Sequence, residues 1–213
     1  MFTRTLSDNT ATALAILGKS KVCKDAYLAG GTALALHLGH RISVDLDFFN
    51  PEVFDSHKII NKLKSLGKYE SQQQTKDTIN GVFNEVKFSY FIYPYKLIFP
   101  TIDFEGIKLA SIQDIAAMKL VAVTDRGTKK DFIDLYFLAH TYSFEKMFEF
   151  YEKKYRLFNQ NRLTILKSLT YFFEADESEM PKMIEKIGWD EVKNYFIKTV
   201  PIVAKKILML DDK

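Results

Sequence analysis

Two aspartates separated by one residue stand in an otherwise apolar part of the segment GGTALALHLGHRISVDLDFF. They are Asp45 and Asp47, with Leu46 between them. Alternate residues of a strand face the same side, so the two carboxylates are expected about 7 Å apart on one face. Such a pair repels itself unless a cation neutralises it, and Mg²⁺ binds through one or two carboxylates plus substrate phosphates. The alternative is an edge strand with solvated acids.

A glycine pair precedes these aspartates. Gly30 and Gly31 follow an apolar strand-like segment and open the stretch TALALHLGH, which predicts a short helix ending near Gly39, with Thr32 as its possible cap. Backbone amides at a helix start suit phosphate oxygens, although a glycine pair alone is equally compatible with a plain turn. The bend, the helix and the acidic strand together predict a cation-assisted pocket for a nucleotide triphosphate.

A second group of charged residues lies in KLVAVTDRGTKKDFIDLYFL. Lys119 and Arg126 are seven residues apart, which predicts nearly the same face of one helix, and both side-chain types bind phosphate. Asp131 and Asp134 fall in the first turn of the next predicted helix. They could stabilise the helix dipole, pair with Arg126, or act as a base toward an acceptor hydroxyl. Solvated surface charge is the alternative for the two basic residues.

These two segments resemble the nucleotidyltransferase superfamily that includes DNA polymerase β, in the form found in the AbiEii/AbiGii toxin family. The resemblance covers residues 27–138. It implies Mg²⁺ or Mn²⁺ on Asp45 and Asp47 and an NTP as substrate. The implied catalytic residues are Asp45, Asp47, Lys119, Asp131 and Asp134. The implied nucleotide-binding residues are Gly30, Gly31, Thr32, Arg41, Ser43, Lys119, Arg126 and Lys130.

The function implied by this resemblance is transfer of a nucleoside monophosphate from an NTP to an acceptor hydroxyl, with a tRNA 3′ end or another RNA as a candidate acceptor. The family also implies a cytoplasmic toxin of a toxin–antitoxin or phage-defence system, with a cognate antitoxin protein as a partner. Two alternatives remain open from the residues: a catalytically weak nucleotide-binding sensor or interaction module, and a Mg²⁺-dependent phosphodiesterase.

One position departs from the pattern of the superfamily. Polymerase-β-like enzymes commonly carry a third carboxylate on a later strand, and here the corresponding position in EVKFSYFIYPY is expected to be Ser89. Glu85 could substitute for it if it shared that strand face. Otherwise Asp131 or Asp134 supplies the third acid, or the metal site has two carboxylates.

The remaining pattern predicts an α+β fold, with a mixed sheet and flanking helices in residues 1–110 and a helical bundle in residues 111–213. The resemblance implies that this bundle contributes to the active site. Asn80-Gly81 predicts a tight turn between two strands, and Pro201 a kink in the last helix. The later helices are expected at Phe144–Tyr155, Arg162–Phe173 and Asp190–Leu208. Basic groups near Lys153–Arg156 and Lys205–Lys206 could contact RNA but are usually solvated.

Composition narrows the class of protein. The 213 residues are 47% hydrophobic, which is ample for a packed core, and the net charge of +3 neither requires nor excludes a nucleic-acid partner. The single cysteine, Cys23, excludes an intrachain disulfide and fits a reducing compartment. We expect no secretory signal and no membrane span, because the N-terminus lacks a basic start followed by an apolar run and no sufficiently long apolar segment follows.

Overall fold

The computed structural model describes residues 1–156 and 161–209. The chain divides into two compact units, Met1–Ser111 and Ile112–Lys213, and each is described by itself. The predicted lobes divide one residue earlier, after residue 110. The predicted α+β class is confirmed, with strands in the first unit and helices alone among the described elements of the second. Within the described ranges, no helix is both long and apolar enough to cross a membrane.

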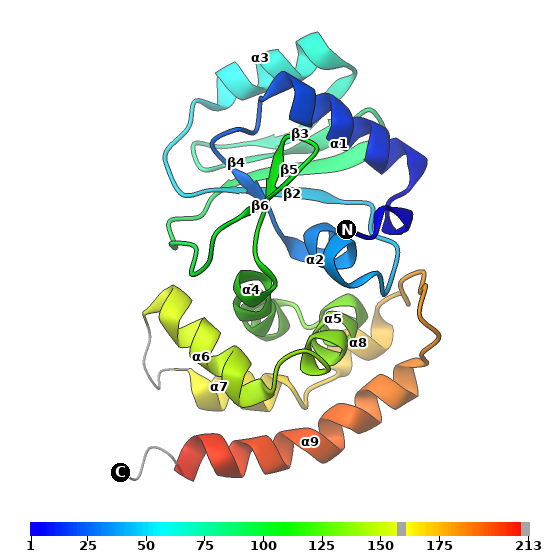
Figure 1. The fold of residues 1–213 in the computed structure, drawn as a ribbon, viewed down its shortest axis with the longest axis vertical. Helices are drawn as coiled ribbons and strands as arrows, with labels where there is room; N and C mark the ends of the chain where they lie inside the picture. The colour runs from blue at the N-terminus through cyan, green and yellow to red at the C-terminus, as the bar shows by residue number, and fades with distance from the viewer. Residues whose placement is uncertain (157–160, 210–213) are drawn as a thin grey trace. The chain divides into compact units, whose positions relative to one another are not determined.

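A mixed sheet forms the centre of the first unit (Figure 1). Its described strands are β1 (Tyr27–Leu28), β2 (Leu46–Asn50), β3 (Tyr69–Gln74), β4 (Thr78–Phe83), β5 (Val86–Ile92), β6 (Ile102–Phe104) and β7 (Ile107–Leu109). Their order across the sheet is β3-β4-β5-β2-β1-β7-β6. β2 pairs in parallel with β5 and β1 in parallel with β7, while the other pairs are antiparallel.

Helices cover both faces of this sheet. They are a 3₁₀ turn η1 (Thr3–Thr5), α1 (Asp8–Ser20), α2 (Gly30–Leu38) and α3 (Ser56–Leu66). Figure 1 shows α1 and α3 on one face and α2 on the other. The sequence sets their starts, because Ser7 caps α1 and Asp55 caps α3 by accepting a hydrogen bond from a backbone N–H of the first turn. Gly39, with φ of +75°, ends α2 as predicted.

The strand alternation of β2 separates a buried face from a half-buried face that carries Asp47 and Phe49. Leu46, Phe48 and Asn50 are buried, and Phe48 stacks on Tyr90 of β5 with ring centroids 6.4 Å apart. Asp47 lies on the opposite face, because successive strand residues point to opposite sides. The acidic face of β2 is therefore the face that α2 covers, and the aromatic core lies on the side of α1 and α3.

The turn predicted at Asn80-Gly81 is wrong. Both residues lie inside β4, and the turn falls at Asn84 and Glu85, which have φ values of +47° and +67°. Gly81 is needed for close packing instead of for a turn, because a Cβ there would lie 2.7 Å from the hydroxyl oxygen of Tyr69 on β3.

The second unit is helical throughout its described elements. They are α4 (Ile112–Asp125), α5 (Lys129–Ala139), α6 (Phe144–Tyr155), α7 (Arg162–Ser168), α8 (Phe173–Glu177) and α9 (Trp189–Met209). The bounds of α6 are those predicted. The single helix predicted over Arg162–Phe173 is wrong, because α7 ends at Ser168 and α8 begins at Phe173. Pro201 lies within α9, which continues through it.

Aromatic packing and buried ion pairs hold these helices together. The ring of Phe132 on α5 packs edge-on against Phe196 of α9, with centroids 5.2 Å apart. Lys154 of α6 donates from Nζ to a carboxylate oxygen of Asp114 on α4 at 2.7 Å, and both side chains are fully buried. Burial lowers the pKa of Lys154, while the hydrogen bond and the charge of Asp114 oppose this shift. Lys154 is therefore not available to contact RNA, although its sequence neighbours suggested a basic patch.

Candidate active site

The carboxylate of Asp47 lies against the glycine bend. Gly30 has φ of +67°, and a Cβ placed on it would lie 3.2 Å from Oδ2 of Asp47. The backbone supports this arrangement, because the N–H of Ala29 donates to the carbonyl oxygen of Asp47 at 3.1 Å. Only glycine occupies this backbone conformation without strain, so the bend lets the start of α2 approach the acid on β2 closely.

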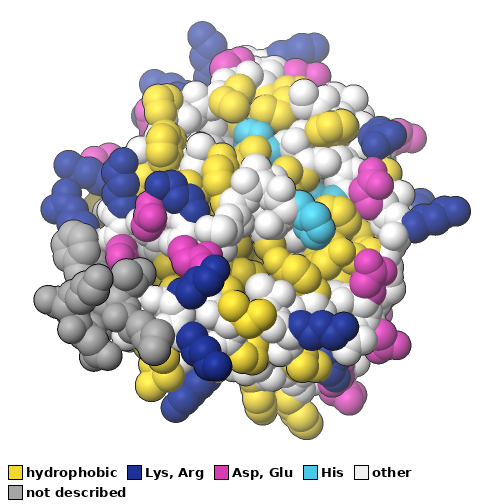
Figure 2. Space-filling view, turned by 60° about the horizontal axis from the view of Figure 1, so that its bottom comes forward, with side chains coloured by type: hydrophobic (Ala, Val, Ile, Leu, Met, Phe, Trp, Pro, Cys, Tyr) yellow, Lys and Arg dark blue, Asp and Glu magenta, His cyan; other side chains and the backbone are white. Residues whose placement is uncertain are grey.

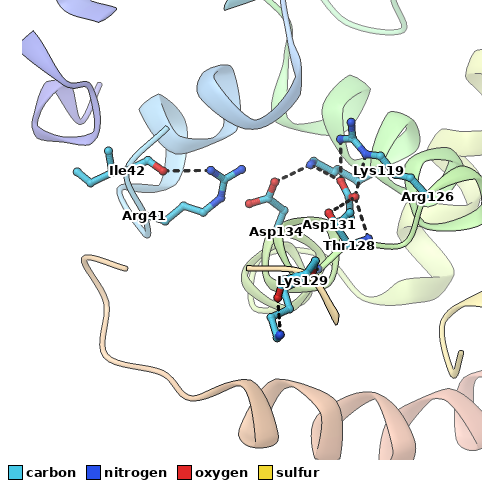
Figure 3. A network of polar contacts seen from close by, with 9 residues as sticks. Arg41, Ile42, Lys119, Arg126, Thr128, Lys129, Asp131 and Asp134 are labelled. Atoms are coloured by element: carbon cyan, nitrogen blue, oxygen red, sulfur yellow. Dashed lines mark hydrogen bonds and ion pairs between the residues drawn. The ribbon is translucent and has the colours of Figure 1, made fainter. Parts of the chain in front are cut away.

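A guanidinium group occupies the space beside Gly31. A side chain at this position would overlap with Nη2 of Arg41, and Ser43 Oγ lies 3.3 Å from the same point. Arg41 is only 2% exposed, and its Nη1 donates to the carbonyl oxygen of Ile42 at 3.2 Å (Figure 3). The missing Cβ of Gly31 thus makes room for the positive group that phosphate oxygens would require.

Thr32 ties the helix to the segment that carries the acids. It does not cap α2, because the N-cap is Ala29 and the described structure records no side-chain cap there. Its hydroxyl instead donates to the carbonyl oxygen of Asp45 and lies 2.9 Å from Ser43 Oγ. Five predicted nucleotide-site residues of the first unit, Gly30, Gly31, Thr32, Arg41 and Ser43, are thereby brought to one place with Asp47.

The two acids have different backbone settings. Asp47 belongs to β2, whereas Asp45 lies directly before the strand, and both side chains are half-buried. Among residues 1–156 and 161–209, no group of three or more His, Cys, Asp or Glu side chains forms a complete metal cage. Two carboxylates without further protein ligands fit Mg²⁺ or Mn²⁺, because such ions take their other oxygens from water and phosphate.

The position of the missing third acid is now visible. Ser89 of β5 pairs in register with Asp47, and the side chains of a parallel register pair share a sheet face. Ser89 is buried beside the acid, as expected from the sequence. Glu85 cannot replace it, because Glu85 lies in the turn before β5, where Asn9 donates to its carboxylate at 2.9 Å.

The second predicted cluster forms a buried network within the helical unit (Figure 3). Lys119 Nζ lies 2.9 Å from Asp131 Oδ1 and 2.6 Å from Asp134 Oδ2, and the two carboxylates are fully buried. Arg126 donates two hydrogen bonds to the Asp131 carboxylate, from Nε to Oδ2 and from Nη2 to Oδ1, each at 3.0 Å. Arg126 lies beyond the end of α4, and its side chain is 64% exposed, so it does not share the buried setting of Lys119 as the helical spacing predicted.

Asp131 also closes the start of α5. It forms a capping box with Thr128, whose hydroxyl donates to Asp131 Oδ2 at 2.8 Å. Burial raises the pKa of Asp131, but the charges and hydrogen bonds of Lys119 and Arg126 outweigh it and hold the pKa well below the usual range. An acid held ionised in this way is a weak base, so the contacts favour a positioning role. Sequence reasoning overlooked Thr128, although a threonine three residues before an acid is a capping signature.

Lys130 is the remaining predicted residue of the second unit, and it lies outside this network. Lys130 is exposed, while its neighbour Lys129 donates from Nζ to the carbonyl oxygen of Asp176 at 2.9 Å.

Basic and acidic side chains are interspersed with hydrophobic ones on the face drawn in Figure 2. This face therefore carries mixed charge instead of the one-sign field that would attract a polyanion over a wide area.

In the first unit, His37 of α2 is also held by backbone. Its Nε2 lies 2.9 Å from the carbonyl oxygen of Ala110. Burial lowers its pKa, a shift that the hydrogen bond to Ala110 opposes and the positive N-terminus assists. A half-buried imidazole bonded to a backbone carbonyl indicates a structural role for this residue.

Comparison with known proteins identifies the family to which this chain belongs. Residues 12–202 match the family model described as "Nucleotidyl transferase AbiEii toxin, Type IV TA system". The chain is 43% identical over 185 residues to the uncharacterized protein aq_aa25 of Aquifex aeolicus (strain VF5), covering 84% of this chain and 88% of that protein.

Solved structures share the fold at low sequence identity. JHP933 from Helicobacter pylori has a TM-score of 0.59 and 19% identity, covering 97% of each chain. MenT4, the nucleotidyltransferase toxin Rv2826c from Mycobacterium tuberculosis H37Rv, has a TM-score of 0.55 and 13% identity, covering 92% of this chain and 86% of its own. A putative nucleotidyltransferase from H. pylori has a TM-score of 0.56 and 17% identity, covering 96% and 98%.

Proposed function

Because this chain belongs to the AbiEii family of nucleotidyltransferase toxins of type IV toxin–antitoxin systems, we propose that it transfers a nucleoside monophosphate from an NTP to an acceptor hydroxyl with Mg²⁺ or Mn²⁺. The observation that carries this proposal is the contact between Asp47 and the glycine bend, where a Cβ on Gly30 would lie 3.2 Å from the carboxylate. This contact places a carboxylate that can bind a cation beside backbone amides that can bind phosphate oxygens.

The residues of the first unit divide into two roles in this proposal. Asp45 and Asp47 would hold the metal ion, which when bound neutralises charge that develops on the phosphate oxygens. Gly30 and Gly31 let the Asp47 carboxylate and the Arg41 guanidinium approach the start of α2, where this guanidinium would face the triphosphate. Thr32 and Ser43 hold the Asp45 segment against α2 and so orient the acids.

The catalytic or nucleotide-binding roles of Lys119, Arg126, Lys130, Asp131 and Asp134 stay predictions. The ion pairs among Lys119, Arg126 and the two aspartates favour a positioning role within the helical unit.

We further propose an RNA hydroxyl as the acceptor, with the tRNA 3′ end as the first candidate, and a cognate antitoxin as the partner of a toxin that acts in the cytoplasm. Membership of a toxin family supports these proposals. Attack of a terminal hydroxyl on the α-phosphate would release pyrophosphate, so the new bond is a phosphodiester.

The test is incubation of each α-³²P-labelled NTP with total RNA and Mg²⁺, followed by electrophoresis of the RNA. We expect label transfer, with a loss of about 10²–10³-fold in Asp47→Asn, because removal of one charge-stabilising group typically costs that much. Asp77→Asn is the matched control, since Asp77 is an exposed acid of the same unit. Equal activity in both variants would overturn the proposed metal role.

One observation favours the second function, a nucleotide-binding module without transfer activity. Ser89 occupies the position in register with Asp47 where a third carboxylate is expected. Saturable NTP binding that Asp47→Asn abolishes, without labelled RNA, would establish this alternative. Release of nucleoside monophosphate from an RNA or dinucleotide substrate, without consumption of NTP, would establish a phosphodiesterase.

A further inference from the structure

A pocket of about 920 Å³ lies in the first unit, on the opposite face of the sheet from Asp47. Its walls come from the end of α1 and the loop after it, the end of β2 and the loop after it, α3, and Lys108 of β7. Asn50 and Tyr90, which line it, belong to the core face of the sheet, whereas Asp47 belongs to the other face. The pocket is therefore separate from the glycine bend.

The floor of this pocket presents a hydroxyl donor. Tyr90 is 1% exposed and lines the pocket, and its oxygen accepts a hydrogen bond from Asn50 Nδ2 at 3.0 Å. In the part of the chain that the structure describes, Asn50 is the partner of this oxygen, so the phenol proton is left to donate elsewhere. A buried hydroxyl that is not used as a donor costs stability unless a ligand or water accepts from it.

The rim of the pocket is rich in lysine. Its basic residues are Lys21, Lys24, Lys58, Lys62 and Lys108. Its acidic residues are Asp25, Glu52 and Asp55. Asp55 already caps α3, where its side chain accepts from the N–H of Lys58 at 3.2 Å. Among the ion pairs of residues 1–156 and 161–209, none includes these five lysines.

The spacing of two of these lysines also indicates an anion. Lys58 and Lys62 are four residues apart on α3 and both line the pocket, so their like charges repel on one helix face. Phe54 and Ile59 give the same cavity an apolar wall, and Phe54 packs edge-on against Tyr90 with centroids 4.7 Å apart. Positive charge beside aromatic and aliphatic surface matches a ligand with phosphate groups and a base or sugar.

We propose that this pocket is a second phosphate-binding site, distinct from the proposed catalytic centre, which takes nucleotide phosphates carried by an RNA strand or by a free nucleotide. Lys58 and Lys62 bind the phosphates, and the Tyr90 hydroxyl donates to the ligand from the floor. The proposal rests on the pocket alone and does not depend on the transfer reaction, so either can fail without the other.

The experiment measures binding by fluorescence anisotropy of a 5′-labelled oligouridylate of 12 nucleotides, without divalent metal and in the Asp47→Asn background. We expect Lys58→Gln/Lys62→Gln to weaken binding about 10-fold at ~0.1 M salt. The double substitution should also reduce the steepness of the plot of log binding constant against log salt concentration by about 1.4, because it removes two phosphate contacts and each contributes about 0.7 on a single strand.

The matched control is Lys64→Gln/Lys87→Gln. It removes the same charge from exposed positions of the same unit that do not line the pocket, and Lys64 lies on the same helix. We expect a change of less than about 2-fold, since exposed charges act weakly beyond a Debye length. Equal losses in both double variants, or no loss in either, would overturn the proposal.

Competition identifies the source of the phosphate. Displacement of the labelled strand by ATP, lost in Lys58→Gln/Lys62→Gln, would assign the site to free nucleotides. Displacement by unlabelled oligouridylate but not by ATP would assign it to an RNA strand. Thermal unfolding of each variant checks folding, and we expect midpoints at or above the parent value because the Lys58–Lys62 repulsion is removed.

Discussion

The two clusters of charged residues in this protein are built from the same side-chain types in opposite ways. In the helical unit, Lys119, Arg126, Asp131 and Asp134 pair with one another at 2.6–3.0 Å, and the carboxylates are fully buried. In the sheet unit, Asp47 lies half-buried against Gly30, and backbone groups of Ala29 and Asp45 hold the acidic segment in place. In the helical unit the charges are neutralised by neighbouring side chains, whereas in the sheet unit backbone hydrogen bonds position the acidic segment.

This difference separates stability from chemistry. A buried network that neutralises itself contributes mainly to a unique packing and is costly to break. A carboxylate that a glycine bend brings close to a helix start lies where the proposed metal and phosphate contacts require it. Matching motifs of charged residues in a sequence can thus have different uses, and the contacts decide between them.

Loss of the central ammonium should give the largest effect on stability. We expect Lys119→Met to lower the free energy of unfolding by about 3–5 kcal/mol, because it leaves the buried carboxylates of Asp131 and Asp134 without their shared cation. Urea denaturation measures this change. Lys130→Met, at an exposed position four residues after Arg126, should change the free energy of unfolding by less than about 0.5 kcal/mol. A similar small change in both variants would remove the contrast between the clusters.

The pH dependence of Asp131 should give an intermediate effect. Its folded pKa is lowered, so its contribution is present above the unfolded pKa of about 3.9 and is lost as pH falls through the folded value. We expect Asp131→Asn to cost about 1.5–3 kcal/mol at pH 7, the usual contribution of hydrogen bonds to a charged group. The gap between the two proteins should narrow below about pH 4. A gap that stays constant down to pH 2 would show that the charge of Asp131 is not responsible.

Substitution at the bend should have the smallest effect on stability. We expect Gly30→Ala to cost about 1–2 kcal/mol, because φ of +67° strains any residue with a Cβ. Label transfer to RNA should fall as well, because the new methyl group would press on the Asp47 carboxylate. Gly188→Ala is the control, since a Cβ there meets no atom within 4 Å. Full transfer activity in a folded Gly30→Ala protein would argue that the bend need not be open.

Much of the fold could be predicted from local signals in the sequence. The caps Ser7 and Asp55, and the bounds of α6, follow from side chains that act within one helical turn. The position of the hairpin turn could not be predicted in this way. Asn80-Gly81 reads as a tight turn, but the ring of Tyr69 from the neighbouring strand requires the space at Gly81. That requirement is set by a residue twelve positions away in the sequence.

The candidate site shows the same limit. The glycine pair and Asp47 could be found from spacing, because a short helix and a strand place them together by ordinary geometry. The change in the role of Thr32 from cap to tether could not, since it depends on how closely the Asp45 carbonyl approaches α2. Seven-residue spacing likewise failed for Arg126, because α4 ends at Asp125 before the second helical position is reached.

The fully buried pair of Lys154 and Asp114 limits how early the helical unit can fold while the chain is being synthesised. The two residues are 40 positions apart, so during synthesis α4 leaves the ribosome well before its countercharge exists. Until then Asp114 must remain hydrated, because an isolated carboxylate is too costly to bury. The helical unit therefore cannot complete its packing cotranslationally before α6 has emerged, and a nascent toxin stays incompletely folded during that interval.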